Sequence, residues 1–168
     1  MDTDAQITAF HEAGHAIAAD ELGAAYYCIS IVPGEEHAGA VGAEGDDCFL
    51  IASGTAPSSP ENEAGDHQAI IDYAGHAAVV ALLGKGDMTE ESAILRGAGP
   101  DFERASHLLQ GDAVSIASTK AKAIELVKRR RSHIEAVAAA LLRRGRLDPQ
   151  QAEWIMLHGE PLPDFLEY

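Results

Sequence analysis

The sequence predicts a mainly helical protein with a small β element, an α+β fold class. Hydrophobic residues make up 46% of the 168 residues but aromatic residues only 5%, so we expect a core of small aliphatic side chains, which suits closely packed helices. Apolar residues recur at three- and four-residue steps in most of the chain, whereas one clear run of β-forming residues occurs near 26–32. The length fits one domain, and we expect a single unit over 1–168.

The first half of the chain is expected to hold two long helices separated by extended segments. Thr3 or Asp4 can cap the first helix, whose apolar stripe continues to about Glu21. The β-forming run stops at Pro33-Gly34, a pair typical of a turn. In order, we expect a helix over 3–21, a strand over 26–32, a weak strand or extended loop over 38–43, a loop over 53–63 and a helix over 62–83.

The second half is expected to be almost entirely helical. Pro100 and Asp101 suit the first turn of a helix, because proline is tolerated there and the helix dipole favours an acid. Asp148-Pro149 combines an N-cap residue with a proline and starts the last helix. In order, we expect an irregular segment or short helix over 85–99, then helices over 101–110, 112–144 and 149–158.

The chain is strongly acidic, with a formal net charge of −15, and the excess of acid lies before residue 120. An acidic body repels phosphate backbones, so we expect no nucleic-acid partner. The basic run over 128–131 could still be a nucleic-acid patch. We favour a solvated helix face, because the run lies inside a helical pattern.

Cysteine usage and the N-terminus indicate a cytoplasmic protein. Cys28 and Cys48 are the only cysteines, and we interpret them as reduced thiols, with metal ligation by the pair as the alternative. The N-terminus lacks the basic start and apolar stretch of a signal peptide. No apolar run approaches the ~20 residues that span a bilayer, so we expect no membrane association.

The sequence His11-Glu12-Ala13-Gly14-His15 is the motif most indicative of chemistry. Two histidines four residues apart lie one turn apart on the same face of a helix, so both imidazoles can reach one ion. Zinc accepts neutral imidazole well, and Glu12 sits where a general base can take a proton from water at the ion. The alternative is a chance match on a structural helix, which the small neighbouring residues make less attractive.

A catalytic zinc site needs a third protein ligand. Asp101 is a candidate because it follows a Gly-Pro break and can be presented at a helix start facing a cleft. An acid in the first turn of a helix is equally explained by the helix dipole. From the residues alone, both interpretations of Asp101 stay open.

Four segments resemble the peptidase domain of FtsH-type proteases, the membrane-bound AAA+ proteases. Residues 8–16 resemble the zinc-binding helix of that family, and residues 29–34 resemble the strand and turn that follow it. Gly99 to Ala105 is similar to the segment whose aspartate is the third zinc ligand, and 121–155 resembles the C-terminal helices. The likeness covers most of the chain in the same order.

The resemblance implies a zinc metalloendopeptidase with a zincin-like active-site helix. It assigns His11, His15 and Asp101 as zinc ligands and Glu12 as the catalytic base. It places the metal site within about 1–110 and a C-terminal helical bundle within about 112–158. The expected substrate is a peptide or unfolded protein, for which the strand near 28–32 or the weaker 38–43 segment could offer an edge. An oligomer or a separately encoded ATPase partner is possible.

The chain also departs from the family pattern. It contains no P-loop, so we expect peptide hydrolysis without ATP. His76 stands where the family carries an arginine, and Val79 and Val80 stand where it carries a pair of glutamates. His76 could support the metal ligands, although a packed helix histidine is the favoured interpretation. The alternative function is a non-catalytic zinc-binding or protein-interaction module derived from a protease domain.

Overall fold

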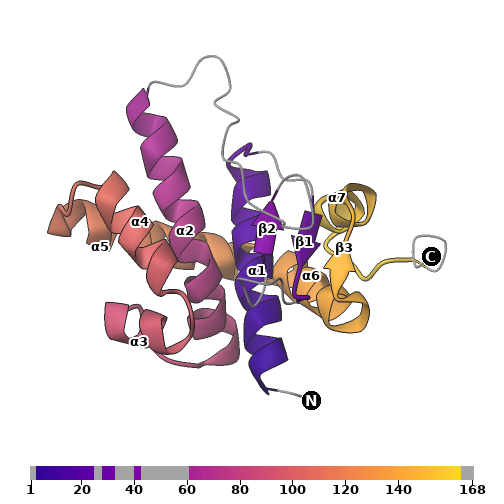
Figure 1. Cartoon of the computed structure of the whole chain (residues 1–168). Coiled ribbons are helices and arrows are strands. Elements are labelled where there is room, and N and C mark those ends of the chain that lie inside the picture. The colour runs from indigo at the N-terminus through magenta and orange to yellow at the C-terminus, as the bar shows by residue number, and fades with distance from the viewer. Residues whose placement is uncertain (1–2, 25–27, 33–39, 43–60, 164–168) are drawn as a thin grey trace.

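The structure is a computed structural model that describes residues 3–24, 28–32, 40–42 and 61–163. Within these ranges the fold is mainly helical, with seven helices and a small antiparallel sheet, which confirms the predicted fold class at this level (Figure 1). The helices are α1 (Thr3–Glu21), α2 (Glu61–Leu83), α3 (Glu90–Leu95), α4 (Gly99–Leu108), α5 (Ala113–Arg129), α6 (Arg131–Arg144) and α7 (Pro149–His158). The strands are β1 (Cys28–Ser30), β2 (Ala40–Gly42) and β3 (Arg146–Leu147).

Helix α1 lies at the centre of the molecule, where it packs against α2 on one side and α6 on another (Figure 1). Every residue from 12 to 19 is buried, as expected for a helix that is covered on all sides rather than on one face. The approach to α2 is very close at Gly14, where an added Cβ would lie 2.4 Å from the carbonyl oxygen of Ala74. Small residues therefore set the distance between the two helices.

The sheet has the strand order β2-β1-β3, with antiparallel pairing on both sides of β1. Ile29 is fully buried and lies opposite Val41 on one side and Leu147 on the other. Of the strand predicted near 26–32, residues 28–30 are confirmed, 31–32 lie beyond the end of β1, and 26–27 lie outside the described residues. The strand alternative for 38–43 is confirmed for 40–42. Strand β3 was not predicted, because two residues carry no recognisable alternation and pair only through contact with β1.

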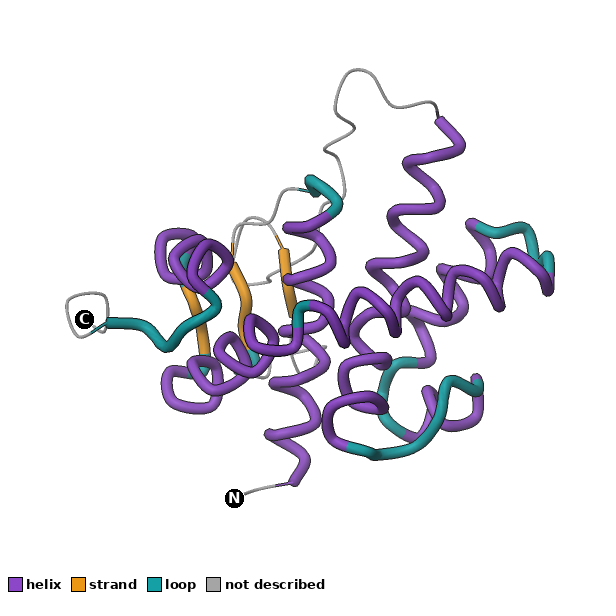
Figure 2. Tube along the Cα trace, turned by 180° about the vertical axis from the view of Figure 1, so that it is seen from behind, coloured by secondary structure: helices purple, strands orange, loops and turns teal. Residues whose placement is uncertain are grey.

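One prediction for the C-terminal half is wrong: residues 112–144 form two helices rather than one. Helix α5 ends at Arg129 and α6 begins at Arg131, with Arg130 between them at φ −97° and ψ 20°. Seen from behind in Figure 2, α5 packs on α2 whereas α6 packs on α1. The break changes the direction of the chain, so that each helix can pack along a different helix. No proline or glycine occurs at this position in the sequence to indicate it.

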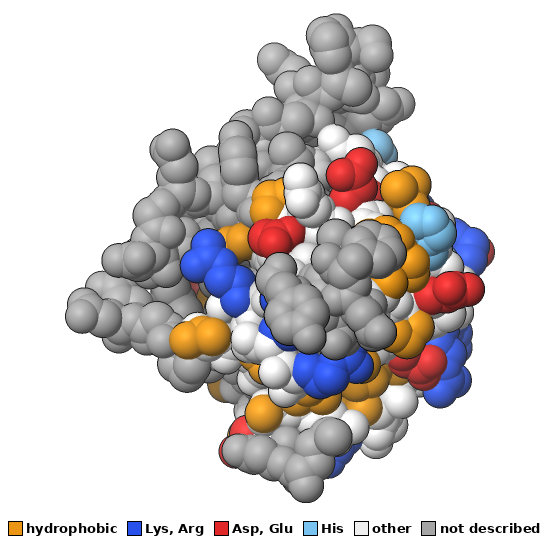
Figure 3. Space-filling model, turned by 90° about the vertical axis from the view of Figure 1, so that its right-hand side faces the viewer, with side chains coloured by type: hydrophobic (Ala, Val, Ile, Leu, Met, Phe, Trp, Pro, Cys, Tyr) orange, Lys and Arg blue, Asp and Glu red, His pale blue; other side chains and the backbone are white. Residues whose placement is uncertain are grey.

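The basic run at this break is used in ion pairs. Arg129 and Arg130 both pair with Glu21 at the end of α1, and Arg131 pairs with Glu135 along α6. On the face of the molecule shown in Figure 3, basic and acidic side chains are interspersed among the residues that the structure describes. These contacts fit the helix-face interpretation of residues 128–131, while the expected absence of a nucleic-acid partner stays a prediction.

The start of α7 confirms the predicted cap. The Asp148 side chain accepts a hydrogen bond from the backbone N–H of Gln151, and the Gln151 side chain accepts one from the backbone N–H of Asp148. Pro149 occupies the first turn, where its missing N–H has no cost. Helix α2 ends as predicted at Gly84, whose φ of 65° favours glycine.

The prediction of reduced cysteines is wrong at Cys28, which is disulfide-bonded. Cys48 lies outside the described residues, as do the predicted turn at Pro33-Gly34 and most of the predicted loop over 53–63. Among the described residues, no helix combines the length and the apolar character that crossing a membrane requires.

We expect Gly14→Ala to destabilise the protein by about 1–3 kcal/mol, because the new methyl group must push α1 away from the backbone of α2. Gly65→Ala is the matched control, since a Cβ at that position of α2 meets nothing within 4 Å among the described residues. It should stabilise the helix by up to about 1 kcal/mol. Denaturant unfolding of both variants measures the difference, and equal stability of the two would contradict the packing described here.

Candidate metal centre

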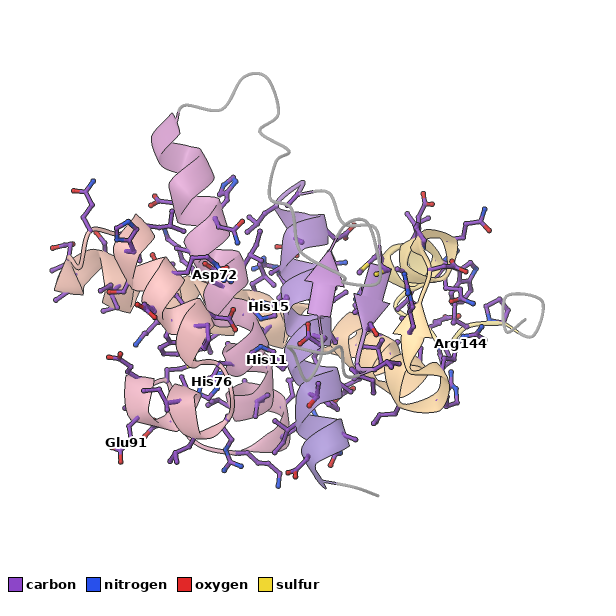
Figure 4. The ribbon with its side chains drawn as sticks, viewed as in Figure 1. His11, His15, Asp72, His76, Glu91 and Arg144 are labelled. Atoms are coloured by element: carbon purple, nitrogen blue, oxygen red, sulfur yellow. The ribbon has the colours of Figure 1, made fainter. Side chains whose placement is uncertain are left out.

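Helices α1 and α4 bring three metal-ligating side chains together. His11 and His15 lie one turn apart on α1 and point toward α2 and α4 (Figure 4), and Asp101 stands in the first turn of α4. The Nε2 atoms of the two histidines are 2.9 Å apart, and Asp101 Oδ2 lies 3.2 Å from that of His11 and 3.3 Å from that of His15. The sequence left the role of Asp101 open, and the fold places it at the histidine pair.

These three residues could hold a metal ion, because each presents one ligand atom and the three atoms lie within 4.8 Å of one another. Ligand atoms around a tetrahedral ion with bonds of ~2.0 Å are about 3.3 Å apart, close to the spacing found here. Two imidazole nitrogens with one carboxylate oxygen are also donors that divalent transition metals accept. The geometry therefore fits an ion held by His11, His15 and Asp101.

His15 is held in the orientation that metal binding requires. Its Nδ1 lies 2.8 Å from the backbone carbonyl oxygen of Ile71, which can only accept, so Nδ1 donates and Nε2 is the atom that faces Asp101. The ring also lies directly over Gly75 of α2, where an added Cβ would be 2.4 Å from Nε2. The sequence predicts Ile71 on the inner side of its helix but assigns neither Ile71 nor Gly75 to the site, because both act through contacts between α1 and α2.

Asp101 is held from its other side by Arg104, one turn along α4. The guanidinium Nη2 donates to Asp101 Oδ1 at 2.8 Å, which leaves Oδ2 facing the histidines. Arg104 also donates two hydrogen bonds to Asp72 of α2, from Nε to Oδ2 at 3.0 Å and from Nη2 to Oδ1 at 2.8 Å. Asp72 is buried and accepts a further hydrogen bond from Gln68 at 2.7 Å. No sequence pattern predicts this network, although Arg104 stands three residues after Asp101, one turn away on the same helix.

The charges of the centre are strongly coupled. Burial disfavours the charged form of His15, but the neighbouring Asp101 carboxylate outweighs it and raises the pKa of His15 to about 9. Burial likewise opposes ionisation of Asp101, yet the two histidines hold the pKa of its carboxyl well below the usual range. Without a metal, the residues thus form a proton-bearing cluster, and an incoming cation would displace a proton from His15.

Glu12 lies beside this cluster on α1 and is buried, with 6% of its surface exposed. Burial raises the pKa of its carboxyl, and the nearby His11 and His15 act in the opposite direction. A carboxylate with a raised pKa accepts protons more readily than an ordinary surface glutamate. Glu12 thus has the environment expected of a general base next to the two histidines.

His76 does not belong to the group of three ligands. Its ring is fully buried, its Nε2 lies 2.7 Å from the carbonyl oxygen of Asp87, and it packs edge-on against Phe102 at 5.3 Å between ring centroids. These contacts match the favoured interpretation of a packed helix histidine. Val79, on the same helix, is fully buried in the core.

The sheet also corrects the expectation about a strand edge. Strand β1 pairs with β2 on one side and β3 on the other, so residues 28–30 offer no edge. Strands β2 and β3 are the two outer strands of the described sheet, and β2 packs against α1. Of the two segments considered from the sequence, only the one containing Ala40–Gly42 stands at an edge.

Comparisons with protein families and with curated proteins identify no relative of this chain. No model of a protein family matches the chain, and no curated protein matches it. The resemblance to FtsH-type proteases therefore rests on the sequence motifs alone.

We expect the metal-free protein to lose stability as the pH rises toward 9. The pKa of His15 is about 9 in the folded protein and 6.5 when unperturbed, so its ion pair with Asp101 stabilises the fold fully below pH 6.5 and disappears as the pH passes 9. Thermal unfolding of chelator-treated protein between about pH 6 and 10 measures this loss. His15→Gln should flatten the dependence, and a wild-type curve as flat as that of the variant would exclude the ion pair.

Gly75→Ala should weaken metal binding about 10–100-fold, because the new Cβ forces the His15 ring away from the Ile71 carbonyl that orients it. Competition between the protein and a chromophoric chelator for zinc measures the affinity. Gly65→Ala, on the same helix but in open space, is the control and should bind as the wild type does. An unchanged affinity in Gly75→Ala would show that the ring is not confined at this position.

Proposed function

We propose that this protein is a zinc-dependent peptidase that hydrolyses peptide bonds without ATP. The observation that carries the proposal is the meeting of Asp101 Oδ2 with the Nε2 atoms of His11 and His15, next to the buried carboxylate of Glu12. The histidine pair by itself would be only moderate evidence for a metal site. A third ligand from a helix about ninety residues away along the chain, together with a suitable base, is what a catalytic centre needs.

The donor set favours zinc among the ions that such a site could hold. Zinc in hydrolytic enzymes is commonly bound by three protein ligands, including histidine and carboxylate, with a fourth position for water or substrate. When bound, zinc would supply Lewis-acid chemistry, polarising a substrate carbonyl and lowering the pKa of water toward ~7. The resemblance to the FtsH-type peptidase domain supports the same ion and the same ligands.

The protein's own residues would provide the proton transfers and the positioning. Glu12, in its buried setting, takes a proton from the attacking water and later delivers it to the leaving amine nitrogen. Asp101 and the Ile71 carbonyl keep the two histidine rings from turning away. The centre is thus preorganised before a substrate arrives.

An extended peptide is the substrate class that the fold best accommodates. Strand β2 is one of the two outer strands of the described sheet, and it lies against α1, the helix that carries both histidines and Glu12. A peptide that adds to this edge would hydrogen-bond through its main chain, so recognition would depend little on its side chains. Unfolded segments satisfy this requirement, whereas folded domains do not.

A non-catalytic zinc module is the second candidate. The family's glutamate pair is replaced by Val79 and Val80, and the buried Val79 offers no charge to the metal centre. A module that only binds zinc would need the two histidines and Asp101 but would not need Glu12. The role of Glu12 therefore separates the two functions.

The proposal predicts about one zinc per chain and slow cleavage of an unfolded, casein-like substrate. Glu12→Gln should retain zinc but lose activity by at least about a hundredfold, because it keeps the shape of the side chain without a proton acceptor. Elemental analysis and a peptide-release assay measure the two properties. Glu103→Gln, an exposed position on α4, is the control and should behave as the wild type.

Two results would decide against the proposal. Zinc-loaded wild type that cleaves no better than Glu12→Gln across a broad peptide library would favour the non-catalytic module. If the protein neither contains zinc nor binds it when zinc is added, the proposed zinc site itself is wrong.

A further inference from the structure

Arg104 occupies a position where it contacts two acidic groups with different surroundings. Its Nη2 lies 2.8 Å from Asp72 Oδ1 on α2 and 2.8 Å from Asp101 Oδ1 on its own helix. The Asp72 side chain is 1% exposed, that of Asp101 15% and that of Arg104 52%. One guanidinium therefore joins a buried carboxylate to the carboxylate that faces the histidine pair.

We propose that Asp72 and Arg104 are positioning residues of the metal centre, which hold Asp101 so that it presents Oδ2 alone to the ion. This inference rests on the proposed zinc site.

The contacts distinguish this role from a simple clamp between helices. A clamp would need only the pair formed by Arg104 and Asp72, which already links α4 to α2 through two hydrogen bonds. Arg104 makes an additional contact, and it falls on the Asp101 oxygen that does not face the histidines. With Oδ1 engaged by a charged donor, Oδ2 is the oxygen left for an ion.

Asp72 acts in this arrangement by holding Arg104. An arginine side chain that is half exposed would otherwise sample many rotamers. The buried Asp72, itself held by Gln68 at 2.7 Å, accepts both Nε and Nη2 and fixes the plane of the guanidinium. Asp72 therefore positions Arg104, and Arg104 in turn positions Asp101.

The consequence concerns which ions the centre prefers. A carboxylate that binds through one oxygen suits a four-coordinate ion such as zinc or cobalt, whereas binding through both oxygens raises the coordination number and suits larger ions. Freeing Asp101 Oδ1 should therefore weaken zinc binding and reduce the preference for zinc over manganese.

The test compares the zinc affinity of the full chain by chelator competition, with the visible spectrum of the cobalt-substituted protein as a second readout. Arg104→Met removes the hydrogen-bond donors Nε and Nη2 but keeps most of the length of the side chain. Arg104→Lys keeps the positive charge but lacks the planar guanidinium that donates to both aspartates. Arg131→Met is the matched control, because it removes an exposed arginine that pairs with Glu135 on α6. Circular dichroism of each metal-free variant reports whether it is folded.

We expect Arg104→Met to weaken zinc binding about 10–100-fold, Arg104→Lys to recover part of that loss, and Arg131→Met to bind as the wild type. The cobalt spectrum of Arg104→Met should move from a four-coordinate toward a higher-coordinate form. Asp72→Asn should weaken zinc binding on its own but have no further effect in an Arg104→Met background, because Asp72 acts only through Arg104.

Several outcomes would overturn the proposal. A folded Arg104→Met protein with wild-type zinc affinity and cobalt spectrum would reduce the pair to a clamp between helices. If Arg104→Met fails to fold, because it leaves the Asp72 charge buried without its arginine partner, the double variant Asp72→Asn/Arg104→Met, which carries neither charge, takes its place. Wild-type zinc affinity with a wild-type cobalt spectrum in that folded double variant would overturn the proposal. If the wild type binds no zinc, the proposed metal centre fails, and this role fails with it.

Discussion

The close contact between α1 and α2 is the constraint on which the proposed metal centre depends. At Gly14 the backbones approach so nearly that an added Cβ would lie 2.4 Å from Ala74 O, and at Gly75 the surface of α2 is open only because there is no side chain. The His15 ring fills that opening, and the Ile71 carbonyl fixes its tautomer. Small residues thus do more than fill a core: they bring a backbone carbonyl within reach of the His15 ring.

The second constraint is electrostatic. Placing the buried Asp72 and the largely buried Asp101 at this centre is unfavourable unless each charge is compensated. In the metal-free protein a proton on His15 and the guanidinium of Arg104 provide the compensation for Asp101 and Asp72. A divalent cation would replace the proton with a stronger positive charge, so folding stability, proton release and metal binding should be linked.

Local sequence signals were sufficient for the elements that carry the site. The spacing of His11 and His15 and the Pro100-Asp101 helix start each depend on residues close together in the chain, and the helices that carry them formed as expected. The hydrogen bonds between Asp72 and Arg104 join residues 32 positions apart, so no periodicity reveals them. The break at Arg130 escaped prediction for a similar reason, because it follows from the packing of α5 and α6 on different helices rather than from a helix-breaking residue.

The most direct test of the central claim is a crystal structure with an anomalous difference map recorded at the zinc absorption edge. The expected result is one strong peak within about 2.0–2.2 Å of His11 Nε2, His15 Nε2 and Asp101 Oδ2, with Asp101 Oδ1 still bound to Arg104. A zinc-supplemented crystal with no peak at these atoms, or with its zinc held by a different set of residues, would contradict the assignment of this metal centre.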